Sequence, residues 1–255
     1  MGKTIAIANQ KGGVGKSVIA VNLAEYAHAQ GGRVLVVDLD GQGNTTRFFQ
    51  EDRARDGQGA SLLFHDGASP ALVKVRDRLW LLPADKALSD VDAQFESDDA
   101  VVRRPRAHLA RWAKDFDLVV IDTVPARSRR QIGALVAADV VVTPIGLDKG
   151  SFDGLFDLME DINGVRKNLH SGLHHAAILV NKFRRVNAHQ RRNLEELRLA
   201  FGDRVLPTEL DDRSPVGAAF DAGVTVWHRP NGDSAKKAAL EFRTALDAIL
   251  QRAHS

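Results

Sequence analysis

Short runs of apolar residues alternate with longer amphipathic stretches along most of the chain. Apolar residues at three- and four-residue spacing predict helices. The first ends at Gly31-Gly32, and the others lie at about 100–114, 128–137, 151–168 and 188–200. The runs between them predict strands, and several are apolar throughout, as in strands buried on both faces: 3–9, 33–39, 79–83, 117–121, 139–145 and 177–181. This alternation predicts a single α/β domain over residues 1–255, with a mostly parallel sheet flanked by helices on both faces.

The last seventy residues are less regular. They predict a weak strand at 204–207, a helix from Ser214-Pro215 to Gly223, and a final helix at about 234–253. We expect the apolar stripe of the final helix to pack on the core, because its QRAHS end lacks the cationic amphipathic character of a membrane anchor. Residues 51–75, with glycines and scattered charges, predict a long loop or a weakly ordered excursion.

The composition excludes some kinds of site, and the positive charge is concentrated in particular segments. The chain contains no cysteine, which excludes disulfides, Cys-ligated zinc and iron–sulfur clusters. Its 35 Lys and Arg residues against 33 Asp and Glu residues give a net charge of only +2. Any basic function therefore depends on where the charges are placed. The strongest local excess is a run of five basic residues without an acid between 182 and 192.

A glycine-rich segment joins the first strand to the first helix. It reads Lys-Gly-Gly-Val-Gly-Lys-Ser over residues 11–17. Glycines let such a loop curl so that its N–H groups point at phosphate oxygens, and the helix adds its positive dipole end. We expect Lys16 to neutralise the β- and γ-phosphates and the Ser17 hydroxyl to ligate Mg²⁺. The general phosphate-loop pattern asks for a glycine where this chain has Gln10, and an additional lysine, Lys11, follows instead.

This segment, with its additional lysine, resembles the deviant Walker A motif of the ParA/MinD superfamily of ATPases. Residues 36–46 (VVDLDGQGNTT) resemble the second signature of its ParA branch, 117–125 (DLVVIDTVP) resemble the Walker B strand, and 82–84 (LPA) resemble a Leu-Pro-Ser segment. The resemblance covers most of the chain, is most specific over 3–46 and is thin beyond residue 200. It implies a P-loop NTPase fold and a deviant Walker A, ParA-like ATPase that uses ATP and Mg²⁺.

The resemblance carries roles to individual residues. Lys11 would reach across a dimer to the partner's nucleotide and stabilise charge on the transferred phosphoryl group, as an arginine finger does. Asp40 would position the attacking water, which makes Lys11, Lys16 and Asp40 the catalytic residues. Magnesium would be held by Ser17, Asp38 and Asp122, and the nucleotide by Gly12, Gly13, Val14, Gly15, Lys16, Ser17, Val18 and Asn181. Without the motif, aspartate or asparagine at a strand end is as readily a helix cap or turn former.

The resemblance also suggests a use for the basic run. Clustered arginines without interleaved aromatic residues suit binding to a phosphate backbone, although a solvated helix face is the commoner reason for such a run. In ParA-like proteins, basic residues of the C-terminal half form a nonspecific DNA surface that ATP-dependent dimerisation completes. We therefore expect DNA binding by Lys182, Arg184, Arg185, Arg191 and Arg192. The use of Arg127, Arg129 and Arg130 stays open between DNA, a partner protein and the other subunit.

The leading hypothesis is an ATP-driven dimerisation switch that segregates a plasmid or chromosome. It would bind DNA nonspecifically, hydrolyse ATP weakly unless DNA or a centromere-binding, ParB-type partner stimulates it, and work in the cytoplasm on the nucleoid. The chain resembles the short form, without an N-terminal DNA-reading domain. The alternatives are a MinD-like or other cargo-positioning ATPase and a dethiobiotin-synthetase-like ligase. The cargo, the partner, assembly beyond a dimer, and the effect of Gly41 and Val124, where the family usually has proline, stay open.

Overall fold

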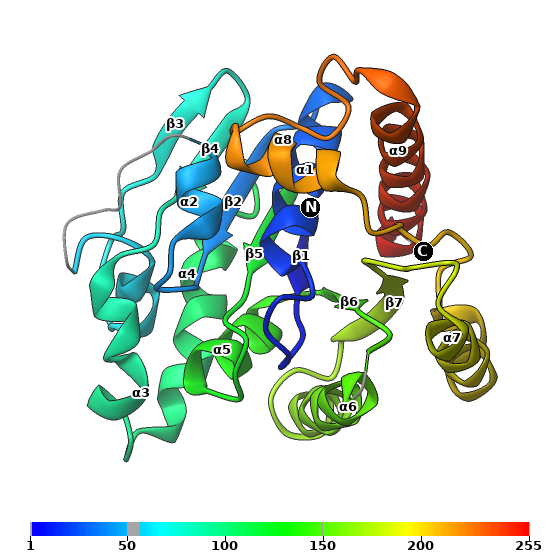
Figure 1. The fold of residues 1–255 in the computed structure, drawn as a ribbon. Coiled ribbons are helices and arrows are strands. Elements are labelled where there is room, and N and C mark those ends of the chain that lie inside the picture. Colours follow the sequence, from blue (N-terminus) through cyan, green and yellow to red (C-terminus); the bar gives the residue numbers. More distant parts are fainter. Residues whose placement is uncertain (1, 50–56, 149, 255) are drawn as a thin grey trace.

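A seven-stranded sheet forms the centre of the molecule (Figure 1). The computed structural model describes residues 2–49, 57–148 and 150–254. The strand order is β3-β4-β2-β5-β1-β6-β7, and every neighbouring pair is parallel except the antiparallel β3–β4 pair. The strands are β1 (Lys3–Ile7), β2 (Val34–Asp38), β3 (Val73–Arg76), β4 (Leu79–Leu82), β5 (Leu118–Asp122), β6 (Val140–Ile145) and β7 (His174–Val180).

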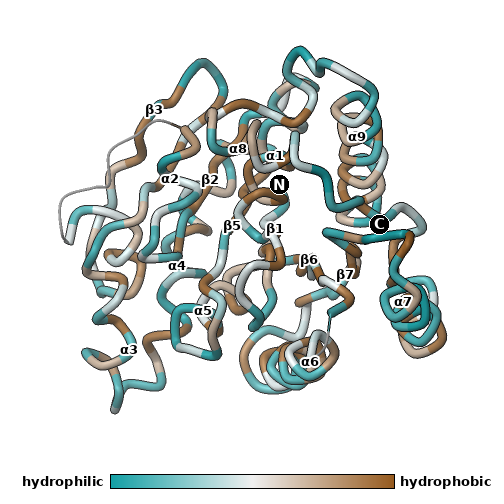
Figure 2. The backbone as a smooth tube through the Cα atoms, in the orientation of Figure 1, coloured by the Kyte–Doolittle hydropathy of each residue, from teal (hydrophilic) through white to brown (hydrophobic). Residues whose placement is uncertain are grey.

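Helices cover both faces of this sheet. One face packs against α1 (Lys16–Ala29), α2 (Asn44–Phe48), α8 (Ser214–Asp221) and α9 (Gly232–His254). The other packs against α3 (Val91–Gln94), α4 (Arg104–Trp112), α5 (Arg129–Ala137) and α6 (Ser151–Asn168), while α7 (Ala188–Phe201) lies beside β7. Figure 2 shows apolar residues on the strands, and both hydrophilic and hydrophobic residues on α6 and α7. The predicted α/β class, with a mostly parallel sheet between two helical layers, is confirmed.

The sheet brings three loops together at one edge. β1 pairs with β5 so that Ile7 lies opposite Asp122, and β2 pairs with β5 so that Asp38 also lies opposite Asp122. Because the carboxyl ends of parallel strands share an edge, the loops that follow β1, β2 and β5 converge there. The glycine-rich segment and the predicted aspartates therefore meet at one place.

Two sequence predictions about irregular regions are wrong. Residues 51–75 are not one long loop: Ala60–Phe64 form a 3-10 helix whose Leu63 and Phe64 are buried, and β3 begins at Val73, while 51–56 lie outside the described residues. The segment 204–207 is not a strand, because only Val205 forms a β-bridge there, to Ile178. Pro207 has no N–H group with which to extend that pairing.

Candidate nucleotide-binding site

The loop between β1 and α1 has the backbone of a phosphate cradle. Gly13 and Gly15 adopt left-handed conformations, with φ of +74° and +90°, which favour glycine strongly. At Gly15 a side chain is also excluded by space, because a Cβ there would lie 2.3 Å from Nδ2 of Asn181. α1 begins at Lys16, so its free N–H groups and positive dipole end face the loop. The local sequence thus builds an anion site from backbone alone.

Lys16 is buried at the start of this helix, with 6% of its surface exposed. Its Nζ donates to the carbonyl oxygen of Lys11 at 3.3 Å, across the loop. Burial lowers the pKa of Lys16, and the charges of Asp122 and Asp40 oppose that shift. A buried ammonium group is costly without an anionic partner, so the position suits a lysine that meets phosphate.

Asp38 and Asp122 form a pair of buried carboxylates behind the loop. Burial, reinforced by the charge of Asp122, raises the pKa of Asp38 to about 7. Burial likewise raises the pKa of Asp122 to about 6, although hydrogen bonds from Ser17 and Thr45 and the charge of Lys16 oppose the rise. Two acids packed this closely in an apolar environment call for a cation.

The hydrogen bonds of these two acids differ. Both the N–H and the hydroxyl of Thr46 donate to Oδ2 of Asp38, at 2.9 and 2.7 Å, which fixes that carboxylate from within the protein. Asp122 accepts from the Thr45 hydroxyl through Oδ2 at 2.8 Å, but its buried Oδ1 has no hydrogen-bond partner among the described residues. An unpartnered oxygen on a carboxylate that the Ser17 side chain also contacts fits the oxygen-rich coordination of Mg²⁺.

Asp40 lies at the mouth of the same site, in the loop after β2. Its Oδ1 accepts from the N–H of Gln42 at 2.9 Å, and its carbonyl accepts from the N–H of Gly43 at 2.8 Å, so a tight turn holds it. With Lys16 and Ser17 it lines a pocket of about 310 Å³. The structure therefore brings Asp40, Asp38, Asp122 and the glycine-rich loop together.

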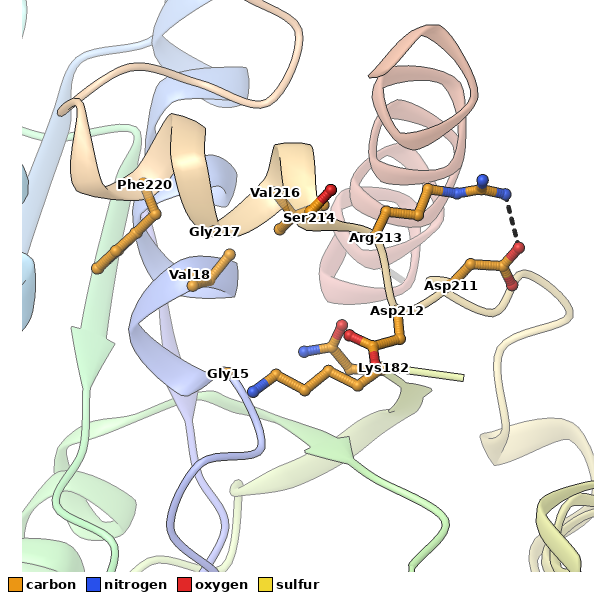
Figure 3. A pocket seen from close by; sticks show the side chains of 11 residues that line it. Gly15, Val18, Lys182, Asp211, Asp212, Arg213, Ser214, Val216, Gly217 and Phe220 are labelled. Atoms are coloured by element: carbon orange, nitrogen blue, oxygen red, sulfur yellow. Dashed lines mark hydrogen bonds and ion pairs between the residues drawn. The ribbon is translucent and has the colours of Figure 1, made fainter. Parts of the chain in front are cut away.

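A second pocket, of about 290 Å³, adjoins the loop on the side of α8 (Figure 3). Asn181 lies in its wall, 5% exposed, with its Nδ2 donating to the carbonyl of Val14 at 2.8 Å. Val18 and Phe220 form an apolar side. Sequence reasoning missed the segment that closes this pocket, which comprises Asp211, Asp212, Arg213, Ser214, Val216, Gly217 and Phe220. Its one sequence signal was the Ser214-Pro215 helix start, which predicts structure and not a site.

Two lysines predicted for other tasks contact the site within the single chain. Lys182 extends toward the loop in Figure 3, and its Nζ donates to the carbonyl of Gly13 at 2.9 Å. Lys11 donates from Nζ to the Ser151 hydroxyl at the start of α6, at 3.0 Å. Lys182 therefore lies at the nucleotide pocket and apart from the arginines with which the sequence groups it.

Those arginines face acids from another part of the chain. Arg184 pairs with Asp212 at 2.8 Å, while Arg185 pairs with Asp211 at 2.9 Å and with Glu209 at 3.3 Å. Arg191 instead donates to the carbonyl of Arg185, which is a neutral partner. Arg192 is exposed and forms no ion pair with any residue that the structure describes. The local charge of +5 is thus partly neutralised by three acids between 209 and 212.

The arginines after β5 are also paired internally. Arg127 pairs with Asp161 of α6 at 2.9 Å. Arg130 pairs with Asp92 at 3.0 Å, and Arg129 pairs with Asp99 at 3.3 Å. The acid-rich stretch around 90–99 therefore contacts Arg129 and Arg130 directly, while Arg127 pairs with α6.

Comparisons with known proteins identify the family of the chain. The model of the AAA_31 family, described as an AAA domain, matches residues 2–175. The chromosome-partitioning ATPase Soj of Thermus thermophilus is 32% identical over 234 residues, which span 91% of this chain and 91% of that protein.

Two solved structures share the fold over nearly the whole chain. Cobyrinic acid a,c-diamide synthase from Mycobacterium smegmatis, with bound ADP and magnesium, is 26% identical with a TM-score of 0.81, and the match covers 100% of this chain and 96% of that one. McdA of Cyanothece, in complex with ATP, is 20% identical with a TM-score of 0.85, covering 97% and 96%. The family match and the partition relative confirm the resemblance read from the motifs: the chain belongs to the AAA_31 family, in the ParA-type branch of the ParA/MinD superfamily of P-loop ATPases.

Proposed function

We propose that this protein is a ParA-type partition ATPase that binds ATP with Mg²⁺ and hydrolyses it to ADP and phosphate. The observation that carries the proposal is the convergence of the left-handed glycine loop, buried Lys16 and the unpartnered Oδ1 of Asp122 at one edge of the sheet. That edge offers N–H donors and a cation for phosphate, and carboxylate oxygen for a metal. Bound Mg²⁺ would neutralise charge on the phosphate oxygens.

The residues of the chain divide the work of the reaction. Lys16 holds the phosphates, and Ser17, Asp38 and Asp122 hold the magnesium shell. Asp40 orients the attacking water, which is supported by its position on the pocket wall that Lys16 also lines. Lys11 serves the second subunit of an ATP-dependent dimer, and its partly exposed position at the start of the phosphate loop, beside α6, supports that role.

Asn181 binds the nucleotide base in the second pocket. Its amide is fixed to the carbonyl of Val14, and Val18 and Phe220 offer apolar surface to a planar ring. The 290 Å³ pocket and the 310 Å³ pocket share Gly15, Val18, Lys182 and Phe220, so one nucleotide would span both.

The ATP-bound dimer binds DNA without sequence preference, and a centromere-binding, ParB-type protein stimulates hydrolysis. In the basic segment 182–192, Arg191 and Arg192 support DNA binding best, because acids do not neutralise them among the described residues. We place the protein in the cytoplasm on the nucleoid. None of the described helices has the length and apolar character needed to cross a membrane.

The experiment is ATP turnover by purified protein with Mg²⁺, measured alone, with random duplex DNA, and with the protein encoded beside it. We expect slow turnover alone and faster turnover with both additions. DNA retention should require ATP and weaken as salt rises, because binding to phosphates releases counterions. Retention that ignores ATP would contradict the switch.

A second candidate is a metabolic synthase, favoured by the full-length similarity to the cobyrinic acid a,c-diamide synthase structure. Such an enzyme would use ATP to activate a carboxylate of a small molecule. Turnover that requires a polycarboxylate substrate and is unaffected by DNA and by the neighbouring protein would favour it. The partition relatives, matched over most of the chain at higher identity, favour the first proposal.

A further inference from the structure

A buried carboxylate on α6 contacts two loops of the nucleotide site. Asp161 lies in the third turn of α6, with 2% of its side chain exposed. Its Oδ2 accepts from Nε2 of Gln10 at 2.8 Å, and its Oδ1 receives the guanidinium of Arg127 at 2.9 Å. Each oxygen of one carboxylate is therefore used by a different loop.

The two partners come from two loops of the proposed nucleotide site. Gln10 stands where the general phosphate-loop pattern has glycine, directly before Lys11. Arg127 follows Pro125 in the loop after Asp122. These loops already lie close together, because a Cβ on Gly12 would be 3.9 Å from Cβ of Pro125.

Burying the charged Asp161 carboxylate costs free energy. Burial raises the pKa of Asp161, with the charges of Asp157 and Glu160 adding to the rise, while Arg127 and Gln10 oppose it. Arg127 is 68% exposed, so the attraction is screened on one side by solvent. An ion pair with one buried and one exposed partner is weak evidence for stability, and in some proteins such polar contacts instead fix one arrangement of the chain.

The same helix fixes the start of the phosphate loop at two further points. The Ser151 hydroxyl accepts from Nζ of Lys11, and Gly154 approaches the loop so closely that a Cβ there would lie 3.6 Å from the backbone nitrogen of Lys11. α6 therefore contacts the segment that carries Lys11 at two points. Asp161 extends these contacts to the loop after Asp122.

We propose that Asp161 is a positioning residue for ATP hydrolysis: it joins Gln10 of the phosphate loop to Arg127 of the loop after Asp122, so that the two loops move together. The inference rests on the proposed ATPase activity. It assigns Arg127 an internal use, and it gives Gln10 a reason to replace glycine.

The first test is Asp161→Asn, which keeps an oxygen for Gln10 and removes the charge that holds Arg127. Asp157→Asn is the matched control, because it makes the same change one turn earlier on α6, at an exposed side chain. We expect Asp161→Asn to lower kcat about tenfold while KM for ATP changes less than about threefold, since small displacements of reacting groups cost rate. The control should keep the wild-type kcat.

A purely structural role predicts a different result. Asp161→Asn would then lower the thermal unfolding midpoint and leave kcat per folded molecule unchanged, which would overturn the inference. If the wild-type protein itself did not hydrolyse ATP, the proposed function would fail before this test began. The two failures are therefore distinguishable.

A double-mutant cycle tests the link itself. If Asp161 joins the loops, Gln10→Ala and Arg127→Ala should each lower kcat in the wild-type protein, and their combined loss should be smaller than the product of the two. In an Asp161→Ala background neither substitution should have a further effect. Two losses that persist in full in that background would show that the loops act independently, and would overturn the proposal.

Discussion

The phosphate loop at 11–17 and the basic segment at 182–192 differ in how far the rest of the fold alters the function that their sequences suggest. The loop keeps its sequence-level meaning in the fold: its glycines adopt left-handed conformations, and its lysine is buried at a helix start. The basic segment does not, because Glu209, Asp211 and Asp212 neutralise part of its charge and Lys182 turns to Gly13.

The difference teaches that a site built by consecutive residues can be predicted from sequence more safely than a site that depends on residues far apart in the chain. A phosphate cradle is made by successive backbone groups, so consecutive residues specify it. The potential of a charged surface is a sum over all neighbours in space, including those far along the chain. A run of arginines is therefore a weaker statement about function than a glycine loop of similar length.

The largest expected effect concerns the phosphate loop. Lys16→Ala removes the buried ammonium group from the phosphate cradle, and we expect ATP affinity to fall by at least about a hundredfold, as charge-assisted hydrogen bonds in a buried site are strong. Binding of a fluorescent ATP analogue measures it. Lys182→Ala removes a lysine on the rim of the same pocket and should cost less. Equal losses would mean that the cradle has no special dependence on Lys16.

Asp40→Ala should separate binding from hydrolysis. Asp40 is held by a turn at the pocket mouth, so its loss should leave the cradle intact and lower kcat about a hundredfold, as expected for a water-positioning group. ATP affinity should change only a few-fold. Single-turnover hydrolysis together with analogue binding gives both numbers. A normal hydrolysis rate would remove Asp40 from the mechanism.

The pH dependence of stability tests the pair of buried carboxylates, Asp38 and Asp122, which the fold brings together from distant parts of the chain. The raised pKa values of Asp38 and Asp122, about 7 and about 6, mean that their contribution to metal-free stability is present below about pH 4 and lost as pH rises through these values. We expect the urea midpoint to fall by roughly 1 M between pH 5 and pH 8, since each pKa unit is worth about 1.4 kcal/mol.

Asp38→Asn is the control for that measurement. Burial lowers the pKa of His175 to about 3, so its contribution has the opposite sign and is lost as pH falls. The informative quantity is therefore the unfolding free energy of the wild type minus that of Asp38→Asn. This signed difference should increase as pH falls from 8 to 5, because the wild-type carboxyl becomes protonated. A constant difference would show that Asp38 titrates normally in the fold.

The smallest expected effect sharpens the second half of the comparison. Replacing Arg191 and Arg192 by alanine should weaken ATP-dependent DNA binding about tenfold and reduce the salt slope by about 2, because each arginine would neutralise one phosphate. Replacing Arg184 and Arg185 should have less effect, because acids already hold them. Filter binding over a salt series compares the pairs. The reverse order would mean that the ion pairs open on DNA.

The sequence predicted the fold and the centre of the site because both follow from local patterns. The buried strands β1, β2 and β5 read as apolar runs, and the motif residues at their ends converge through parallel pairing. Strand β3 is not an apolar run: its Val-Lys-Val-Arg sequence alternates, as does its burial, and four residues are too few to stand out in a region with glycines and scattered charges. The segment 211–220 became visible as a pocket wall only when folding placed it beside Asn181.

The chain segment that follows α7 also protects the sheet. β7 is an edge strand, and an edge with free carbonyls is a template for pairing with another molecule. The N–H groups of Leu206 and Leu210 donate to the carbonyls of Ile178 and Val180 at 2.9 Å each, which occupies that edge without forming a regular strand. The segment that brings acids to the arginines thus also occupies hydrogen-bonding groups through which β7 could otherwise pair with another molecule.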